Sequence, residues 1–207
     1  MSKSLKQRTI VGIIWSSIGK FGTLGISFIS NLVLARLLMP SDFGYIGMIY
    51  IFLAISQVFI SGGLGSALIQ KKEATHLDYT TVFYWNLAFS VFFVVVLFFT
   101  APSIAGFYKM PLLKDILRVQ SIGLIINSFS IVQTTQLQKN LRFKELSVRG
   151  IIASIVGTIV VIALAYKGFG VWSLVYSSLI SGVISVFLLW APIFLPQLID
   201  NQLSIVA

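Results

Sequence analysis

The sequence predicts an all-α, polytopic membrane protein, a bundle of six transmembrane helices. The first observation is the composition: hydrophobic residues make up 57% of the chain and charged residues 10%, against roughly 25% charged in a soluble domain. The second is the length of the charge-free stretches, among them residues 43–70, 79–108 and 168–199. About 20 apolar helical residues cross a hydrocarbon core. A water-soluble fold is therefore excluded.

Each apolar run has to be helical, because backbone groups that face lipid must be paired within their own segment. An outer-membrane barrel does not fit, since none of the runs alternates polar and apolar residues over a sustained length. We expect helices near Thr9–Leu34, Phe43–Ala67, Thr80–Phe107, Ile116–Gln138, Val148–Tyr166 and Val171–Trp190.

The first helix begins like a signal peptide, with basic residues before an apolar run. The run is long, is interrupted by Lys20 and continues through Asn31 to Arg36. These features favour an uncleaved first span.

The breaks between the later helices carry local signals. The segment Pro40–Asp42 ends the first helix with a proline and offers serine and aspartate oxygens as N-caps for the second. Lys71–Asp78 is a polar loop, Pro111 marks the third break, and Lys167–Gly170 is a tight hairpin. These signals separate six spans.

The distribution of Lys and Arg predicts the orientation. The N-terminus and the second and fourth loops hold nine: Lys3, Lys6, Arg8, Lys71, Lys72, Lys139, Arg142, Lys144 and Arg149. The other loops and their helix edges hold five: Arg36, Lys109, Lys114, Arg118 and Lys167. Basic loops stay on the cytoplasmic side, so we expect both termini to be cytoplasmic. The net charge of +9 reflects this topology, and we expect no nucleic-acid partner.

A stripe of polar residues runs along one face of the first helix. Its members are Ser16, Lys20, Thr23, Ser27 and Ser30 or Asn31, with Gly19, Gly22 and Gly25 beside it to allow close helix approach. A lysine inside a membrane helix costs about 2.5–3.5 kcal/mol. We interpret the stripe as the lining of a water-filled cavity in which Lys20 meets an anionic group. The alternative is a snorkelling lysine, with serines bonded to their own backbone.

The fourth helix is also polar, with Arg118 at its entrance and amides and hydroxyls along it. These are Gln120, Asn127, Ser130, Gln133, Thr134 and Gln136. Cavity lining and hydrogen bonding between helices explain them equally well. For the single amides Gln57 and Asn86 we expect bonding between helices.

The remaining polar residues predict little chemistry. Serines at four-residue steps, Ser173 to Ser185, indicate a packing seam of small residues in the sixth helix rather than a conduction path. The chain has one histidine, His76, and no cysteine, so we expect no metal site and no cofactor. Phosphate loops and paired carboxylates within a span are missing, which argues against an enzyme and leaves no carboxylate for proton coupling.

Four segments together resemble the bacterial Wzx-type polysaccharide flippases, within the multidrug/oligosaccharidyl-lipid/polysaccharide flippase superfamily. They are Leu34–Gly44, Gly63–Glu73 with the following His76–Asn86, Gln136–Phe143 and Gly168–Val175. The resemblance extends to about Trp190 and is closest to the branch that exports colanic- or teichuronic-type repeat units. It gives two regions: a six-helix lobe, residues 1–190, and a divergent C-terminal tail, residues 191–207.

The resemblance implies translocation of polyprenyl-pyrophosphate-linked oligosaccharides across the bacterial cytoplasmic membrane by alternating access. It implies two six-helix lobes around a cationic cavity, so that this chain is similar to one lobe. The candidate cavity cations are Lys20, Arg36 and Arg118, and the other candidate lining residues are Thr23, Ser27, Asn31 and Asn127. These assignments follow helix position and charge, because the four segments contain neither Lys20 nor Arg118.

Members of that family have about twice as many helices. The sequence therefore resembles a truncated product, a fragment, or a half-size protein that pairs with a second lobe or a second copy. Two other functions remain open: a small-molecule exporter of the same superfamily, and a non-transporting scaffold of a polysaccharide synthase complex.

Overall fold

The computed structural model describes the backbone of residues 5–206 and the side chains of residues 10–191. Lys3, Lys6 and Arg8, which entered the charge count, have side chains outside this part, as do the tail residues after Ala191. Residues 5–206 form seven α-helices: α1 (Leu5–Leu37), α2 (Pro40–Ser61), α3 (Leu64–Gln70), α4 (His76–Tyr108), α5 (Pro111–Lys139), α6 (Phe143–Tyr166) and α7 (Val171–Val206).

All of these helices except α3 are long and apolar enough to cross a membrane, which gives six spans within the described residues. Large apolar side chains such as Phe21, Phe99 and Phe107 are exposed on their outer faces. Lipid solvates such side chains, so the exposure is the ordinary surface of a membrane protein. The predicted fold class is confirmed.

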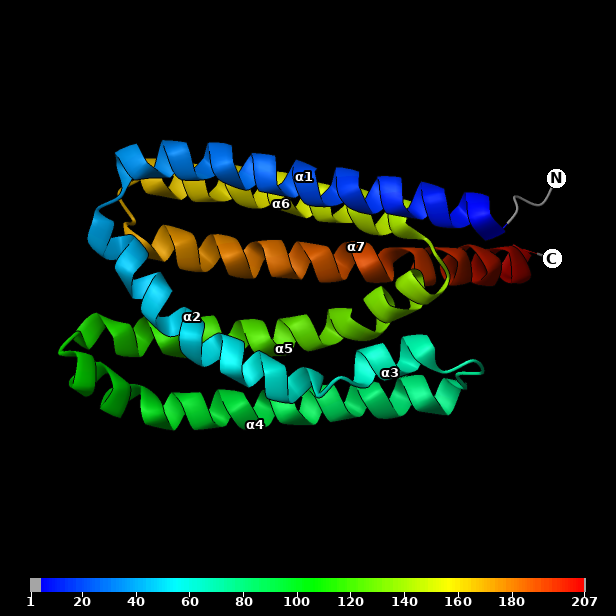
Figure 1. Ribbon diagram of the computed structural model, residues 1–207, viewed down its shortest axis with the longest axis horizontal. Coiled ribbons are helices and arrows are strands. Elements are labelled where there is room, and N and C mark those ends of the chain that lie inside the picture. Colours follow the sequence, from blue (N-terminus) through cyan, green and yellow to red (C-terminus); the bar gives the residue numbers. More distant parts are fainter. Residues whose placement is uncertain (1–4, 207) are drawn as a thin grey trace.

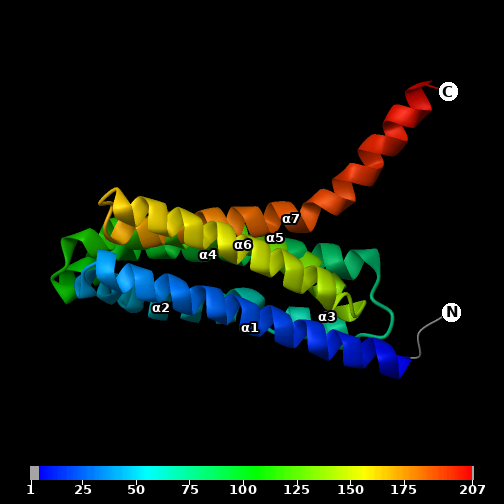
Figure 2. The same ribbon diagram turned by 90° about the horizontal axis from the view of Figure 1, so that it is seen from above.

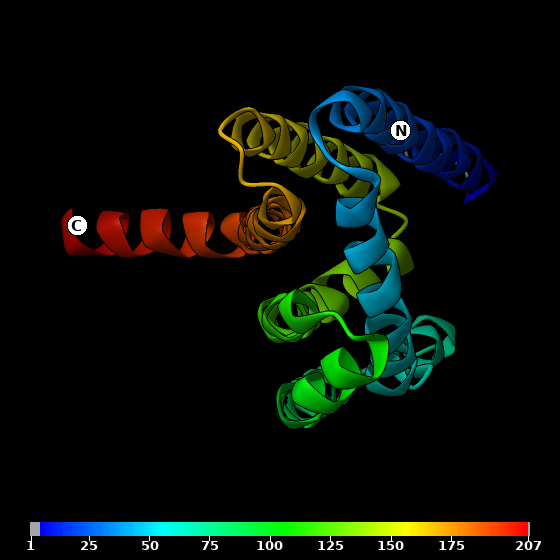
Figure 3. The same cartoon turned by 90° about the vertical axis from the view of Figure 1, so that its left-hand side faces the viewer.

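The spans are arranged as a C, with α2 across its open side (Figure 3). Going around the C, α1 packs on α6, α6 on α7, α7 on α5 and α5 on α4. Helix α2 leaves the far end of α1 and runs diagonally to α4 and α5 (Figure 1). From above, α6 lies between α1 and α7 (Figure 2). The start of α1 and the end of the α7 span lie at the same end of the bundle, as an even number of spans requires.

The second predicted helix, Phe43–Ala67, is in fact two helices, α2 and α3. Gly62 and Gly63 separate them, with φ angles of 48° and 71°. Glycine adopts these left-handed angles without a Cβ clash, so the pair ends α2 and redirects the chain. The short α3 then lies along α5, where the nearest atom to a Cβ built at Gly65 would be the Thr135 hydroxyl, at 3.4 Å.

Several helices begin earlier than their apolar runs. Helix α2 begins at Pro40, and the Asp42 carboxylate accepts the Met39 N–H at 3.0 Å. The N-cap residue is Met39 rather than Ser41 or Asp42, but the prediction that an Asp42 oxygen would serve at this helix start is confirmed. Helix α4 begins at His76, because the Thr75 hydroxyl and the Asp78 carboxylate cap each other's backbone N–H groups.

Helix α3 is fixed at its C-terminus by a lysine from another helix. Lys139, the last residue of α5, donates through Nζ to the carbonyl oxygens of Leu68 at 3.1 Å and Lys71 at 2.6 Å. Carbonyls at a helix C-terminus have no intrahelical donor. Lys139 supplies that donor and ties α3 to α5.

Candidate functional site

Helices α1 and α6 pack closely through glycines on α1. A Cβ built at Gly19 would lie 2.5 Å from the Ser147 Oγ, and one at Gly22 would lie 3.2 Å from Ile151. Ser147 also donates to the Trp15 carbonyl at 2.7 Å. The prediction of close approach is confirmed for Gly19 and Gly22 but not for Gly25, which has no such atom within 4 Å.

This packing turns the later part of the α1 stripe toward a groove between α1, α6 and α7. The groove has a volume of about 370 Å³. Its polar lining residues are Ser27, Ser30 and Asn31 on α1, Ser154 and Thr158 on α6, and Ser177, Ser178 and Ser181 on α7. We call it the α1 groove. Two of the candidate residues, Ser27 and Asn31, lie here.

A second groove, of about 290 Å³, lies between α2, α5 and α7. Its polar lining residues are Gln120, Asn127, Ser130, Ser178 and Ser185. The amide of Gln120 and the hydroxyl of Ser178 are 2.8 Å apart, and Asn127 donates to Gln57 on α2 at 3.1 Å. We call it the α5 groove, and Asn127 is the candidate residue in it.

The two grooves share one residue, Ser178 on α7. Every described residue that lines either groove is neutral, and the polar ones are hydroxyls and amides. Such groups both donate and accept hydrogen bonds. The arrangement can therefore bind a neutral ligand that is rich in hydroxyl groups.

Lys20 lies in neither groove. It lines a separate, mainly apolar pocket between α1 and the start of α6, with Ser16, Leu141 and Phe143 among its neighbours. Thr23, one turn further on, donates to the carbonyls of Gly19 and Lys20 in its own helix. The stripe therefore divides: Ser27 and Asn31 lie in the α1 groove, whereas Lys20 lies in this neighbouring pocket.

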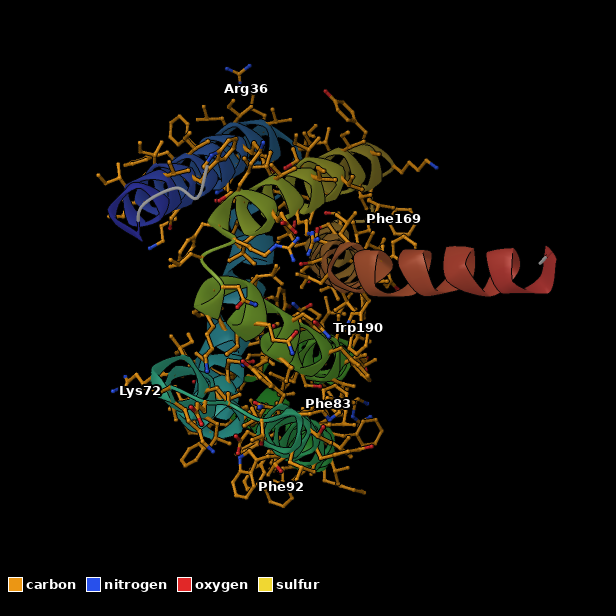
Figure 4. All side chains as sticks on the ribbon, turned by 90° about the vertical axis from the view of Figure 1, so that its right-hand side faces the viewer. Arg36, Lys72, Phe83, Phe92, Phe169 and Trp190 are labelled. Atoms are coloured by element: carbon orange, nitrogen blue, oxygen red, sulfur yellow. The ribbon has the colours of Figure 1, made fainter. Side chains whose placement is uncertain are left out.

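The structure places the two predicted arginines away from both grooves. Arg36 follows Asn31 by five residues, which is about 140° around a helix, and its side chain points away from the bundle (Figure 4). Arg118 donates through Nε to the Phe98 carbonyl at 3.2 Å, and its guanidinium carbon lies 4.1 Å from the centre of the Phe98 ring. Their role as cavity cations stays a prediction that this conformation does not support.

The sequence reasoning missed Ser154, Thr158 and Ser178. A signal was present for the first two, which lie four residues apart in the otherwise apolar part of α6 after Arg149 and therefore share one face. Ser178 has the same character but stands outside the four-residue series that begins at Ser173. A search for serines spaced four residues apart from Ser173 therefore does not find Ser178.

The single amides of α2 and α4 behave differently. Gln57 bonds Asn127 across two helices, as predicted. Asn86 is fully buried, but its side-chain nitrogen donates to the Val82 carbonyl of its own helix at 2.7 Å. The prediction of a hydrogen bond between helices is therefore wrong for Asn86.

The serines of α7 form a packing seam, as predicted. Ser173 and Ser177 are buried and bond backbone carbonyls in or next to their own helix. A Cβ built at Gly157 on α6 would collide with the Ser181 hydroxyl. The seam thus fixes the distance between α6 and α7, and its Ser177 and Ser181 also line the α1 groove.

The fold and its grooves define a polytopic α-helical membrane protein with neutral polar recesses between its spans. Within that class, a match to a family model identifies the family. The chain belongs to the polysaccharide biosynthesis protein family, whose model matches residues 33–198. The family resemblance seen in the sequence is confirmed.

The names of three similar proteins, each of them a biosynthesis protein of a bacterial polysaccharide, agree with this membership. The succinoglycan biosynthesis transport protein ExoT of Rhizobium meliloti is 27% identical over 92% of this chain and 39% of its own length. The lipopolysaccharide biosynthesis protein WzxC of Escherichia coli is 25% identical over 69% of this chain and 29% of its own. The teichuronic acid biosynthesis protein TuaB of Bacillus subtilis is 26% identical over 70% and 30%. The chain spans about two fifths or less of each relative. No solved structure matches it.

Proposed function

We propose that this chain takes part in moving polyprenyl-pyrophosphate-linked oligosaccharide repeat units across the bacterial cytoplasmic membrane, for surface polysaccharide biosynthesis. The observation that carries the proposal is the pair of neutral grooves that share the lining residue Ser178. An oligosaccharide is dense in hydroxyl groups, and amide and hydroxyl side chains pair with them in either direction. The family and the names of the relatives support the same cargo.

Translocation by alternating access needs two bundles that rock against each other. We propose that this chain supplies one bundle and that a second lobe, or a second copy of the chain, supplies the other. The excess of basic residues in the loops at one end of the bundle supports a cytoplasmic position for both termini. The lipid tail of the substrate stays in the bilayer while its headgroup passes between the bundles.

The test is to place a large side chain at the lining residue that the two grooves share. In cells that lack the chromosomal copy, a plasmid-borne Ser178→Phe variant is expected to lose export of the polysaccharide, because its ring narrows both grooves. Val183→Phe is the matched control, since Val183 is on the same helix and its side chain is 53% exposed at the outer surface. Immunoblots of the membrane fraction establish equal amounts of both variants.

Surface polysaccharide and accumulated lipid-linked precursor are the two readouts. Loss of the first with accumulation of the second in Ser178→Phe alone supports a translocation path. Normal export in Ser178→Phe would reject the grooves as the path. Loss of polysaccharide without accumulated precursor would point to a scaffold that synthesis requires.

A further inference from the structure

A charged pocket lies at the end of the bundle where α5 ends and α6 begins. Residues 139–149 hold four basic residues and one acidic residue. A pocket of about 210 Å³ opens there between α5, α6 and α7. Its polar lining residues are Gln133, Gln136, Asn140, Arg142, Glu145 and Arg149. It overlaps Gln136–Phe143, a segment that carried the family resemblance and that the grooves leave unused.

Two arginines of this pocket share one carboxylate. Arg142 donates through Nε to Glu145 Oε1 at 2.6 Å, and Arg149 donates through Nη2 to Oε2 at 3.2 Å. The Arg149 side chain is only 15% exposed. Coulombic attraction is stronger at such a site than in water, because the surroundings screen it less. A second anion would therefore be attracted to this pair.

The other two basic residues of the segment are held elsewhere. Lys139 donates to the carbonyls of Leu68 and Lys71. Lys144 lies over the Trp15 ring, with Nζ 5.3 Å from its centre. The charge of the pocket therefore comes from two guanidinium groups and one carboxylate, and it is positive.

We propose that Arg142 and Arg149 bind the pyrophosphate of the lipid-linked substrate as it enters the bundle. This inference rests on the proposed function. A guanidinium group presents a planar fork of N–H donors that matches phosphate oxygens in pairs, and the amides of Gln133, Gln136 and Asn140 add neutral donors beside it. At about 30 Å³ per water the pocket has the volume of roughly seven waters. That volume accommodates a pyrophosphate group.

Glu145 has a second role in this proposal. Its carboxylate lies between the two guanidinium groups, where the pyrophosphate oxygens would bind. It competes with the substrate, which keeps binding reversible. Removing its charge should therefore tighten binding.

The experiment uses the full chain in nanodiscs and farnesyl pyrophosphate as the probe, with binding followed by quenching of tryptophan fluorescence. Arg149→Gln is expected to weaken binding at least tenfold and Glu145→Gln to strengthen it severalfold. Lys144→Gln is the matched control, because it removes a charge from the same segment but not from the pocket. Arg149→Lys keeps the positive charge, so binding that is retained in this variant shows that Arg149→Gln loses binding through its charge and not through misfolding. Thermal unfolding of each variant checks the folding independently.

Equal affinity of the parental chain and Arg149→Gln for the probe would overturn the inference. Farnesyl monophosphate should bind more weakly than the pyrophosphate. Full competition by inorganic pyrophosphate at the same concentration would support an anion site but overturn its assignment to the lipid-linked headgroup. The two proposals fail separately. Binding that depends on Arg149 without any glycan export rejects the function alone, and export with binding unaffected by Arg149→Gln rejects this site alone.

Discussion

The Nε–H of Arg118 on α5 donates to the carbonyl oxygen of Phe98 on α4, at 3.2 Å. Pro102 lies four residues after Phe98 inside α4 and has no N–H with which to bond that carbonyl. Arg118 therefore replaces the hydrogen bond that the proline removes. The arginine that the sequence marked as a cavity cation is, in this structure, a clamp between two helices.

A double-mutant cycle tests the clamp. Arg118→Ala is expected to lower the free energy of unfolding by about 1–3 kcal/mol, because a carbonyl within a membrane span loses a charged donor. In a Pro102→Ala background, which restores the helical N–H at that position, the same change should cost at most about 1 kcal/mol, the remaining contact with the Phe98 ring. Unfolding in detergent measures both.

The cycle also separates the clamp from a cavity role. A cavity cation is needed whatever residue stands at position 102, so Arg118→Ala would then abolish export equally in both backgrounds. Export that returns in the double variant identifies a structural arginine.

The contact between α1 and α6 is predicted to tolerate no added Cβ at Gly19. Gly19→Ala should lower the free energy of unfolding by about 1–3 kcal/mol, because the methyl group would press on Ser147. Gly25→Ala is the control on the same helix, with open space at its Cβ, and should cost nothing. Equal losses in unfolding experiments would show that helix approach does not depend on Gly19.

Lys139 is predicted to hold α3 in place. Lys139→Gln should cost about 1–3 kcal/mol locally, since the carbonyls of Leu68 and Lys71 lose a charged donor. Faster hydrogen exchange in residues 64–71 would report the loss. Lys72→Gln serves as the control, because its side chain points away from the bundle (Figure 4). Unchanged exchange in Lys139→Gln would contradict the anchoring role.

Lys20 remains the candidate cation of α1. Lys20→Ala is expected to abolish glycan export with the protein still in the membrane, whereas Lys20→Arg should retain export because it keeps the charge. Precursor accumulation and membrane immunoblots provide the measurement. Normal export in Lys20→Ala would favour a lysine that only snorkels to the interface.

The number of spans followed from the sequence, as did the end of α6 at Tyr166 and the start of α7 at Val171, but the starts of the other helices did not. Apolar runs mark the part of a helix that lies in hydrocarbon, while α4, α5 and α6 begin four or five residues earlier, in polar turns. Thr75 and Asp78 had the spacing of a capping box, and Gly62-Gly63 had the signature of a break. The prediction followed the length of the apolar runs and did not use these local signals to place the helix ends.

The site was predicted less well, because helix position does not determine which face meets a neighbour. Ser27 and Asn31 line a groove because glycine contacts with α6 set the rotation of α1, and Asn127 lines one because the Gly123 and Gly182 contacts set how α5 and α7 face each other. The partner of Arg118 is a backbone carbonyl twenty residues earlier. The identities of the side chains at these positions do not reveal that contact.

The neutral lining of the two grooves determines how passage would depend on cargo. On the proposed path no charged group of the described walls would hold a glycan tightly, so it would exchange one hydrogen bond for the next, each worth about 0.5–1.5 kcal/mol net. Conduction needs contacts that are favourable at entry yet weak at exit. Each added sugar would then add weak hydrogen bonds to the walls, which would slow the passage of the repeat unit without preventing it.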